Sequence, residues 1–125
     1  MPVTEGKALM RMYGITNCDT IKTARAWLSE HGIAYRFVDF KKTPPLREQL
    51  TGWCAEAGWQ TLLNRRGTTW KKLDPEKQAA VKDAPAAIAM MLENPTAIRR
   101  PVMETDQGLI VGFDREEWER AFPDR

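Results

Sequence analysis

Residues 13–25, YGITNCDTIKTAR, contain the change from a first strand to a first helix. A short apolar strand over residues 8–13 breaks at Gly14, and a helical pattern of apolar residues starts almost at once. Cys18 is therefore expected at a helix N-terminus, where unpaired N–H groups and the helix dipole favour negative charge. Such positions lower the pKa of a thiol from about 8.5 into roughly the 3.5 to 7.5 range. We expect Cys18 to be a nucleophilic thiolate; the alternative is a small residue at a turn.

Composition indicates one domain of ordinary size. The 125 residues carry a net charge of +2 from 19 basic and 17 acidic side chains, which demands neither nucleic acid nor an anionic membrane as partner. Two cysteines, no secretory leader and no apolar run of membrane-spanning length indicate the cytoplasm. A lone His31 without a Cys/His cluster predicts no metal site. We expect residues 1–7 to be a loose end and residues 8–125 to form a single domain.

Apolar spacing predicts the order of elements. The first helix buries Ile21, Ala24, Trp27 and Leu28 and stops at His31-Gly32. Residues 34–40 alternate as a second strand, and strand-helix-strand in this length implies parallel pairing with a right-handed connection. Residues 101–105 and 109–113, separated by Asp106-Gln107-Gly108, predict a β-hairpin. Asp114 and Glu117 resemble a capping box before a last helix that presents Trp118 and Phe122.

The middle of the chain is predicted to be helical. Thr43-Pro-Pro opens a helix that Gly58 ends, with an apolar stripe that makes Cys54 face the core. That stripe consists of Leu46, Leu50, Trp53, Cys54 and Ala57. A polar loop over residues 64–69 precedes a piece over residues 70–73, Asp74 caps a helix with Pro75 first, and a helix near Pro85 turns Ile88, Met91 and Leu92 inward. The whole order, β-α-β, helical insertion, β-β-α, predicts an α/β thioredoxin-like fold with a mixed four-stranded sheet.

The residue three positions after Cys18 restricts the thiol chemistry. A dithiol oxidoreductase would carry a second cysteine there, but this chain has Ile21, so an internal Cys-x-x-Cys disulfide cannot form. Cys54 is the other cysteine, and its apolar face predicts a buried, inert thiol. Turnover is therefore expected to need an external thiol.

Two pairs of arginines are candidate anion-binding groups. Arg65 and Arg66 lie in a glycine-containing loop, and Arg99 and Arg100 precede Pro101 at a strand start. The alternative is a solvated basic loop. In thioredoxin-like folds a cis proline at this place abuts the cysteine loop, which would bring Arg100 beside Cys18; whether the bond is cis stays open.

Three motifs resemble the ArsC-like family, which contains arsenate reductases, Spx regulators and the YffB proteins. They are YGITNCDTIK (residues 13–22), LNRRGTTWKKL (63–73) and IRRPV (98–102), followed by Gly112-Phe113, and they look most like the YffB branch over about residues 9–122. The resemblance implies a thioredoxin-like fold, Cys18 as nucleophile and Arg100 as the arginine before the proline. It leaves the middle arginine open between Arg65 and Arg66.

Two differences between this sequence and its relatives bear on the activity that we expect. Arsenate reductases carry a further arginine near the end of the hairpin, where this chain has Gly112-Phe113, so little arsenate reduction is expected. Spx regulators usually pair their first cysteine with a second three residues on, which this chain lacks. We therefore expect an oxidoreductase: a cytoplasmic, monomeric monothiol reductase resolved by glutathione or a glutaredoxin, with no tightly bound cofactor.

Several residues receive roles in that reading. Cys18 and Arg100 are the catalytic candidates. The substrate-binding candidates are Asn17, Asp19, Thr20, Arg65, Arg66, Arg99 and Pro101. The alternatives are a non-enzymatic regulator that binds a protein such as RNA polymerase, and a true arsenate reductase.

Overall fold

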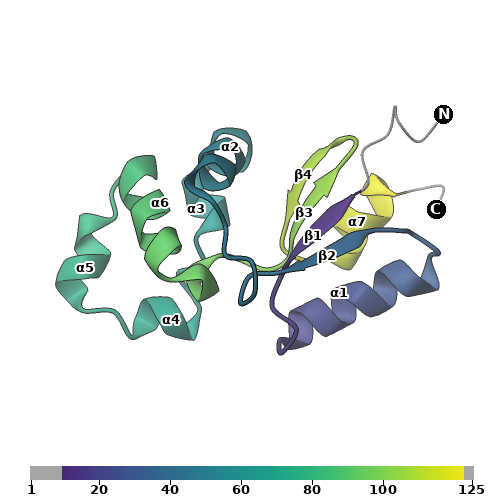
Figure 1. Ribbon diagram of the computed structural model, residues 1–125, viewed down its shortest axis with the longest axis horizontal. Helices are drawn as coiled ribbons and strands as arrows, with labels where there is room; N and C mark the ends of the chain where they lie inside the picture. Colours follow the sequence, from purple (N-terminus) through teal and green to yellow (C-terminus); the bar gives the residue numbers. More distant parts are fainter. Residues whose placement is uncertain (1–9, 123–125) are drawn as a thin grey trace. The chain divides into compact units, whose positions relative to one another are not determined.

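A computed structural model describes residues 10–122 of the chain (Figure 1). These residues divide into two compact units: the first holds residues 10–41 and 100–122, and the second holds Lys42–Arg99. The expected loose end at residues 1–7 lies outside the described residues, and the single-domain assignment stays a prediction.

A mixed four-stranded sheet forms the first unit. Its strands are β1 (Arg11–Gly14), β2 (Arg36–Asp39), β3 (Val102–Thr105) and β4 (Gly108–Val111). They lie in the order β2-β1-β3-β4, with β1 parallel to β2, β1 antiparallel to β3, and β3 antiparallel to β4. This arrangement confirms the predicted α/β thioredoxin-like fold. No helix among residues 10–122 is long and apolar enough to cross a membrane.

Two helices supply the rest of the apolar core in this unit. They are α1 (Asp19–Glu30) and α7 (Arg115–Ala121), drawn beside the sheet in Figure 1. Met12 of β1 and its partner Met103 of β3 are fully buried in one cluster with Trp27 and Trp118. The two indole rings meet edge to face, with centroids 5.5 Å apart. The apolar spacing of α1 thus fixes which side of the helix faces the sheet.

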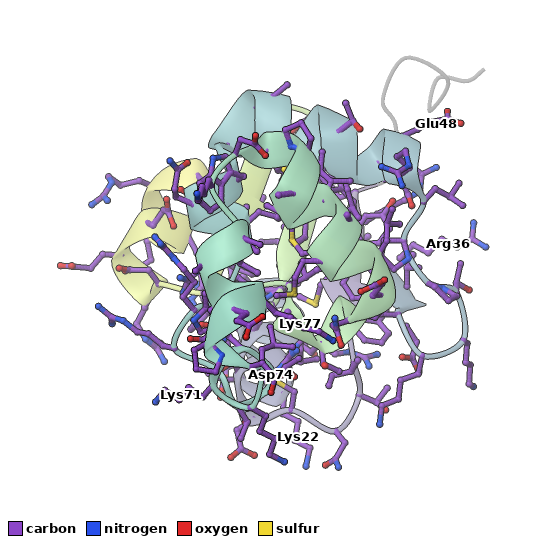
Figure 2. All side chains as sticks on the ribbon, turned by 90° about the vertical axis from the view of Figure 1, so that its left-hand side faces the viewer. Lys22, Arg36, Glu48, Lys71, Asp74 and Lys77 are labelled. Carbon is purple, nitrogen blue, oxygen red and sulfur yellow. The ribbon has the colours of Figure 1, made fainter. Side chains whose placement is uncertain are left out.

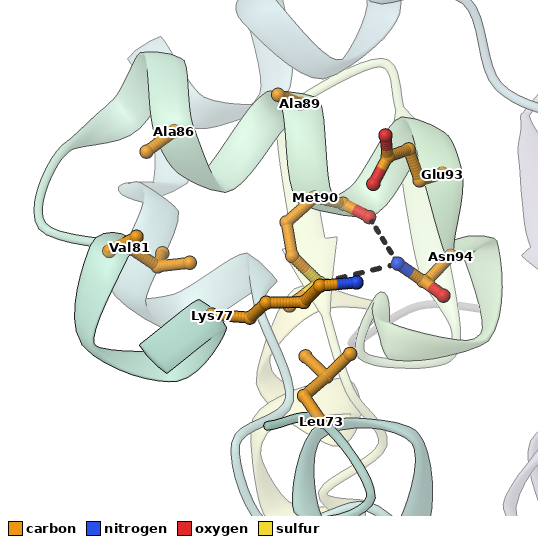
Figure 3. A pocket seen from close by; sticks show the side chains of 9 residues that line it. Leu73, Lys77, Val81, Ala86, Ala89, Met90, Glu93 and Asn94 are labelled. Carbon is orange, nitrogen blue, oxygen red and sulfur yellow. Dashed lines mark hydrogen bonds between the residues drawn. The ribbon is translucent and has the colours of Figure 1, made fainter. Parts of the chain in front are cut away.

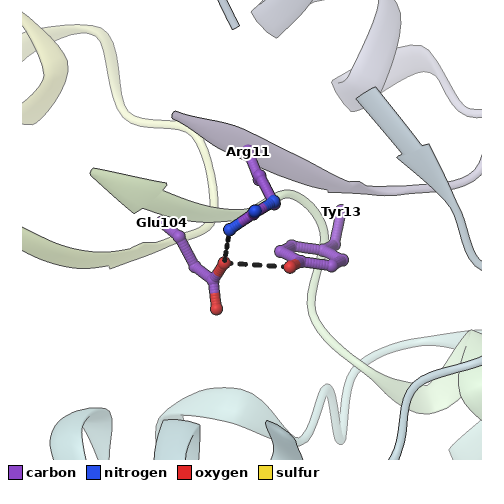
Figure 4. Close-up of polar contacts among 3 residues, drawn as sticks. All are labelled: Arg11, Tyr13 and Glu104. Carbon is purple, nitrogen blue, oxygen red and sulfur yellow. Dashed lines mark hydrogen bonds and ion pairs between the residues drawn. The ribbon is translucent and has the colours of Figure 1, made fainter. Parts of the chain in front are cut away.

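A polar cluster crosses from β1 to β3 on the opposite side of the sheet (Figure 4). The Tyr13 hydroxyl donates to Glu104 Oε1 at 2.9 Å, and Arg11 Nη1 lies 3.7 Å from the same oxygen. Tyr13 also stacks on Phe40, with ring centroids 5.9 Å apart. Residues one position apart along β1 therefore serve opposite faces, as strand geometry requires.

The second unit is helical. Its elements are α2 (Arg47–Ala57), α3 (Trp59–Leu62), α4 (Thr68–Lys71), α5 (Pro75–Ala80), α6 (Ala84–Glu93) and the 3-10 helix η2 (Pro95–Ala97). Its buried apolar residues are Leu50, Trp53, Cys54, Leu62, Leu63, Ala87, Ile88, Met90, Met91, Ala97 and Ile98. Leu63 and Ile98 form an isolated antiparallel bridge. Lys71, Asp74 and Lys77 lie exposed at the surface of this unit (Figure 2).

The structure corrects some local predictions. Leu46 belongs to the predicted buried stripe, yet 62% of it is exposed because it is the extended N-cap residue before α2. Thr68 and Thr69 begin α4 instead of ending the polar loop. Asp74 precedes α5, but its side chain makes no capping hydrogen bond.

Smaller differences concern chain boundaries. Gly108, expected in the hairpin turn, pairs with Thr105 and begins β4. Leu92, expected to face inward, is only half-buried. The spacing of apolar residues predicts where a helix or strand lies better than it predicts the first and last residues, because those depend on local backbone geometry.

Candidate thiol site

Cys18 is the N-cap residue of α1, as the sequence pattern predicts. Its backbone is extended, with φ −154° and ψ 125°, and its carbonyl accepts a hydrogen bond from the Lys22 N–H at 3.0 Å. No side-chain hydrogen bond caps the helix. The N–H groups in the first turn of α1 therefore remain able to donate hydrogen bonds to the Cys18 thiol.

A close contact between the end of β1 and the first turn of α1 positions this helix start. A Cβ atom added at Gly14 would collide with the Ile21 side chain, which is fully buried. The absence of a side chain at Gly14 therefore leaves room for the buried Ile21 side chain against the end of β1.

The thiol of Cys18 lies among hydrogen-bond donors. Partial burial would by itself raise its pKa, because a charged sulfur loses solvent. Hydrogen bonds from the Ile21 N–H, the Arg100 side chain and the Thr20 N–H, with the positive charge of Arg100, oppose this effect. Together they hold the pKa of Cys18 below the ordinary thiol value. The half-buried Cys18 thiol therefore combines partial exposure with a lowered pKa, the two features that favour reactivity in a cysteine.

Arg100 reaches the thiol from the segment just before β3. The Arg100–Pro101 peptide bond is cis, and Pro101 is buried. The guanidinium donates a hydrogen bond to the Cys18 sulfur. The structure thus places Arg100, Pro101 and Cys18 within the first unit, together with Asn17, Asp19 and Thr20 of the loop and helix start.

The remaining candidate arginines belong to the second unit. Arg65 lies over the Trp59 ring, with its guanidinium carbon 5.6 Å from the ring centroid. The Arg66 N–H donates to Asn64 Oδ1 at 3.1 Å. Arg99 donates through Nε to the Thr61 carbonyl at 2.9 Å. A role for these three side chains at the thiol stays a prediction.

Sequence reasoning missed the contribution of Ile21. The sequence predicts Ile21 as a buried residue of the first helix and as the position where a second cysteine is absent, yet its backbone N–H also bonds the thiol. The signal was available: any residue three positions into a helix offers an unpaired N–H toward its N-cap.

Cys54 has the opposite environment. It lies on α2, 8% exposed, and burial raises the pKa of its thiol. Both cysteines are free thiols. Within residues 10–122, no three His, Cys, Asp or Glu side chains gather as a metal site would require.

The fold and this thiol define a thioredoxin-like protein with a cysteine of lowered pKa at a helix N-cap. The chain belongs to the ArsC family, whose sequence profile matches residues 13–121. It is similar to the solved structure of a protein called YFFB, with 48% identity and a TM-score of 0.85, covering 90% of this chain and 97% of that one. This similarity confirms the resemblance to the YffB branch.

Two further relatives carry names that describe a function. An arsenate reductase related protein from Brucella melitensis is 43% identical, with a TM-score of 0.74, covering 92% of this chain and 95% of that one. The global transcriptional regulator Spx of Enterococcus faecalis is 28% identical over 92% of this chain and 87% of its own length. The family therefore includes both oxidoreductase-like proteins and regulators.

Proposed function

We propose that the protein is a cytoplasmic, glutathione-dependent monothiol reductase in which Cys18 is the nucleophile. The observation that carries the proposal is the place of Cys18 at the N-cap of α1, beside the Ile21 and Thr20 N–H groups and Arg100, which together hold its pKa below the ordinary thiol value. A thiolate is the attacking species in thiol–disulfide exchange, and a depressed pKa supplies it at neutral pH. A reducing compartment keeps such a thiol free.

The proposed cycle balances with two molecules of glutathione. The Cys18 thiolate attacks a substrate disulfide, the S–S bond breaks, and one substrate thiolate leaves with its electron pair. A first glutathione thiolate then attacks the mixed disulfide at the substrate sulfur and releases Cys18. Exchange with a second glutathione releases the remaining substrate thiol and yields glutathione disulfide. A glutaredoxin could replace glutathione as the resolving thiol, and an oxyanion could replace the disulfide as electrophile.

The side chains around the thiol receive roles within this proposal. Arg100 stabilises the thiolate and holds an anionic group of the substrate or a glutathione carboxylate. Asn17, Asp19 and Thr20 shape the loop that the substrate meets. Arg65 or Arg66, with Arg99, would bind a second anionic group. No tightly bound cofactor is required, because the electrons arrive from glutathione, and the enzyme acts as a monomer.

A coupled assay tests the proposal. Purified protein receives a small mixed disulfide of glutathione, excess glutathione and glutathione reductase, and NADPH oxidation is followed. We expect activity that Cys18→Ser abolishes and Arg100→Ala lowers, while Arg120→Ala, an exposed arginine on α7, leaves it unchanged. When Cys18 attacks the glutathione sulfur of this mixed-disulfide substrate, glutathione stays disulfide-bonded to the protein until a free glutathione removes it, and mass spectrometry should find it on Cys18 alone. Activity that persists in Cys18→Ser would overturn the assignment.

The Spx relative supports a second candidate, a non-enzymatic regulator that binds a protein such as RNA polymerase. The absence of a second cysteine at Ile21 removes the disulfide switch but not a docking role. Cys18→Ser separates the two candidates: a docking role survives it, whereas a reductase does not. Partner capture is therefore measured beside the coupled assay.

Arsenate reduction is the third candidate, supported by the arsenate reductase related protein of Brucella melitensis. Gly112-Phe113 stands where the resemblance places a further arginine in arsenate reductases. We therefore expect little arsenate-dependent NADPH oxidation in the presence of glutathione, a glutaredoxin and glutathione reductase. Turnover with arsenate equal to that with the mixed disulfide would make arsenate the preferred substrate class.

A further inference from the structure

A pocket of about 400 Å³ lies within the second unit, lined by α5, α6 and the turn before α5 (Figure 3). Its apolar lining includes Leu73, Val81 and Met90, and its polar lining consists of Lys77, Glu93 and Asn94. The volume falls in the range of small-molecule sites, about 300 to 1,000 Å³. An apolar lining with a few polar groups is also typical of such sites.

Two opposite charges line this pocket without neutralising each other. Lys77 comes from α5 and Glu93 from the last turn of α6. Neither side chain has an ion-pair or hydrogen-bond partner among residues 10–122. A lysine and a glutamate on separate helices of one pocket therefore offer one cationic and one anionic contact to a ligand.

Asn94 adds an oriented acceptor. Its Nδ2 donates to the Met90 carbonyl at 3.1 Å and approaches the Met90 sulfur at 3.7 Å, as the dashed lines in Figure 3 show. These contacts engage the NH₂ group of the amide and leave its Oδ1 able to accept a hydrogen bond. An ammonium group in the pocket would thus find both a carboxylate and an amide oxygen.

We propose that this pocket binds a free α-amino acid with an apolar side chain, of the leucine, methionine or phenylalanine type. The ligand ammonium would contact Glu93 and Asn94 Oδ1, its carboxylate would contact Lys77, and its side chain would lie against Leu73, Val81 and Met90. Lys77 and Glu93 are both exposed side chains at the rim of the pocket, so a zwitterion can use both charges, whereas a simple anion or cation can use only one of them. The site is independent of the thiol chemistry proposed for Cys18.

Amide NMR spectra of the full chain, titrated with L-leucine, test the inference. We expect saturable shifts confined to α5, α6 and the preceding turn, with a Kd of about 1 mM or tighter. L-leucinamide lacks the carboxylate and 4-methylpentanoate lacks the ammonium, so each should bind at least about tenfold more weakly. L-serine, which cannot fill the apolar lining, should produce no saturable shifts.

Matched variants assign the contacts. Lys77→Met and Glu93→Gln should each weaken L-leucine binding by about tenfold, since each removes one charge contact. Ala89→Trp should abolish binding by filling the pocket from its exposed rim. Lys82→Met and Glu76→Gln, exposed charges outside the pocket lining, serve as controls and should bind normally. The inference is overturned if L-leucine causes no saturable shifts, or if L-leucinamide and 4-methylpentanoate bind as well as L-leucine.

Discussion

The Arg100 guanidinium donates a hydrogen bond to the Cys18 sulfur, which joins the segment before β3 to the N-cap of α1. This contact adds both a donor and a positive charge to the thiolate, so it distinguishes the site from a thiol at an ordinary helix start. It is also the contact that a single substitution can remove.

Arg100→Ala should raise the pKa of Cys18, because the variant loses the hydrogen bond and the positive charge that Arg100 supplies to the thiol. The thiolate fraction at neutral pH then falls, and alkylation by iodoacetamide slows by about threefold or more. The alkylation rate measured against pH gives the apparent pKa directly. Arg120→Ala is the control, and an apparent pKa that is the same in both variants would remove Arg100 from the site.

The free energy of unfolding should depend on pH through Cys18. Because its pKa is lower in the folded protein, the unfolded chain binds more protons between the two pKa values, and stability rises with pH there. The contribution is fully present above the unfolded thiol pKa and is lost as pH falls through the folded one. Urea unfolding of the native protein and of Cys18→Ser, compared across pH, isolates it. A difference that is constant with pH contradicts the lowered pKa.

Cys54→Ala should leave turnover with glutathione nearly unchanged. The thiol is buried on α2 with a raised pKa, so it is a poor nucleophile, and its removal costs about 1 kcal/mol of stability. The coupled assay measures whether turnover is unchanged, and urea unfolding measures the loss of stability. Oxidation of the native protein provides a separate check: an intramolecular Cys18–Cys54 disulfide, found by mass spectrometry, would make Cys54 the resolving thiol.

Gly14→Ala should destabilise the first unit by about 1 to 3 kcal/mol, because the added methyl group collides with Ile21. Displacing Ile21 also weakens its N–H contact with the thiol, so alkylation of Cys18 should slow. Gly52→Ala is the matched control: it lies on α2 with open space around its Cα, and should gain roughly 0.5 to 1 kcal/mol. Equal effects of the two substitutions would contradict the close approach.

Three aspartates at helix starts should differ in their effect on stability. Asp114 accepts from the Glu116 and Glu117 N–H groups, and Asp83 accepts from the Ala86 N–H at 3.0 Å. Replacing either by alanine should cost about 1 kcal/mol. Asp74 makes no such bond, so Asp74→Ala should cost little. Thermal unfolding of the three variants measures the difference; a similar loss in Asp74→Ala would show that its cap forms in solution.

Sequence patterns predicted the fold well because the longer helices α1, α2 and α6 each bury a periodic apolar face. The spacing of Ile21, Ala24, Trp27 and Leu28 placed α1, and all four are buried. The position of Cys18 at a helix start could also be predicted, because a strand that breaks before a run of polar residues indicates where a helix begins.

Other features could not be read from pattern. Leu46 continues the apolar stripe of α2, but its extended backbone directs it to solvent. Asp74, Asp83 and Asp114 precede helices alike, and only the local backbone decides which of them accepts a hydrogen bond. Contacts made by backbone N–H groups, such as that of Ile21, carry no sequence signature of their own.

The Cys18–Arg100 contact has a consequence for the order of events during synthesis. Cys18 leaves the ribosome early, whereas Arg100 and β3 follow only after the whole of Lys42–Arg99 has been made. Until then the nascent chain carries a thiol without its guanidinium and without the central antiparallel strand of its sheet. The part of the pKa lowering that Arg100 contributes therefore becomes available only after the whole second unit has been translated.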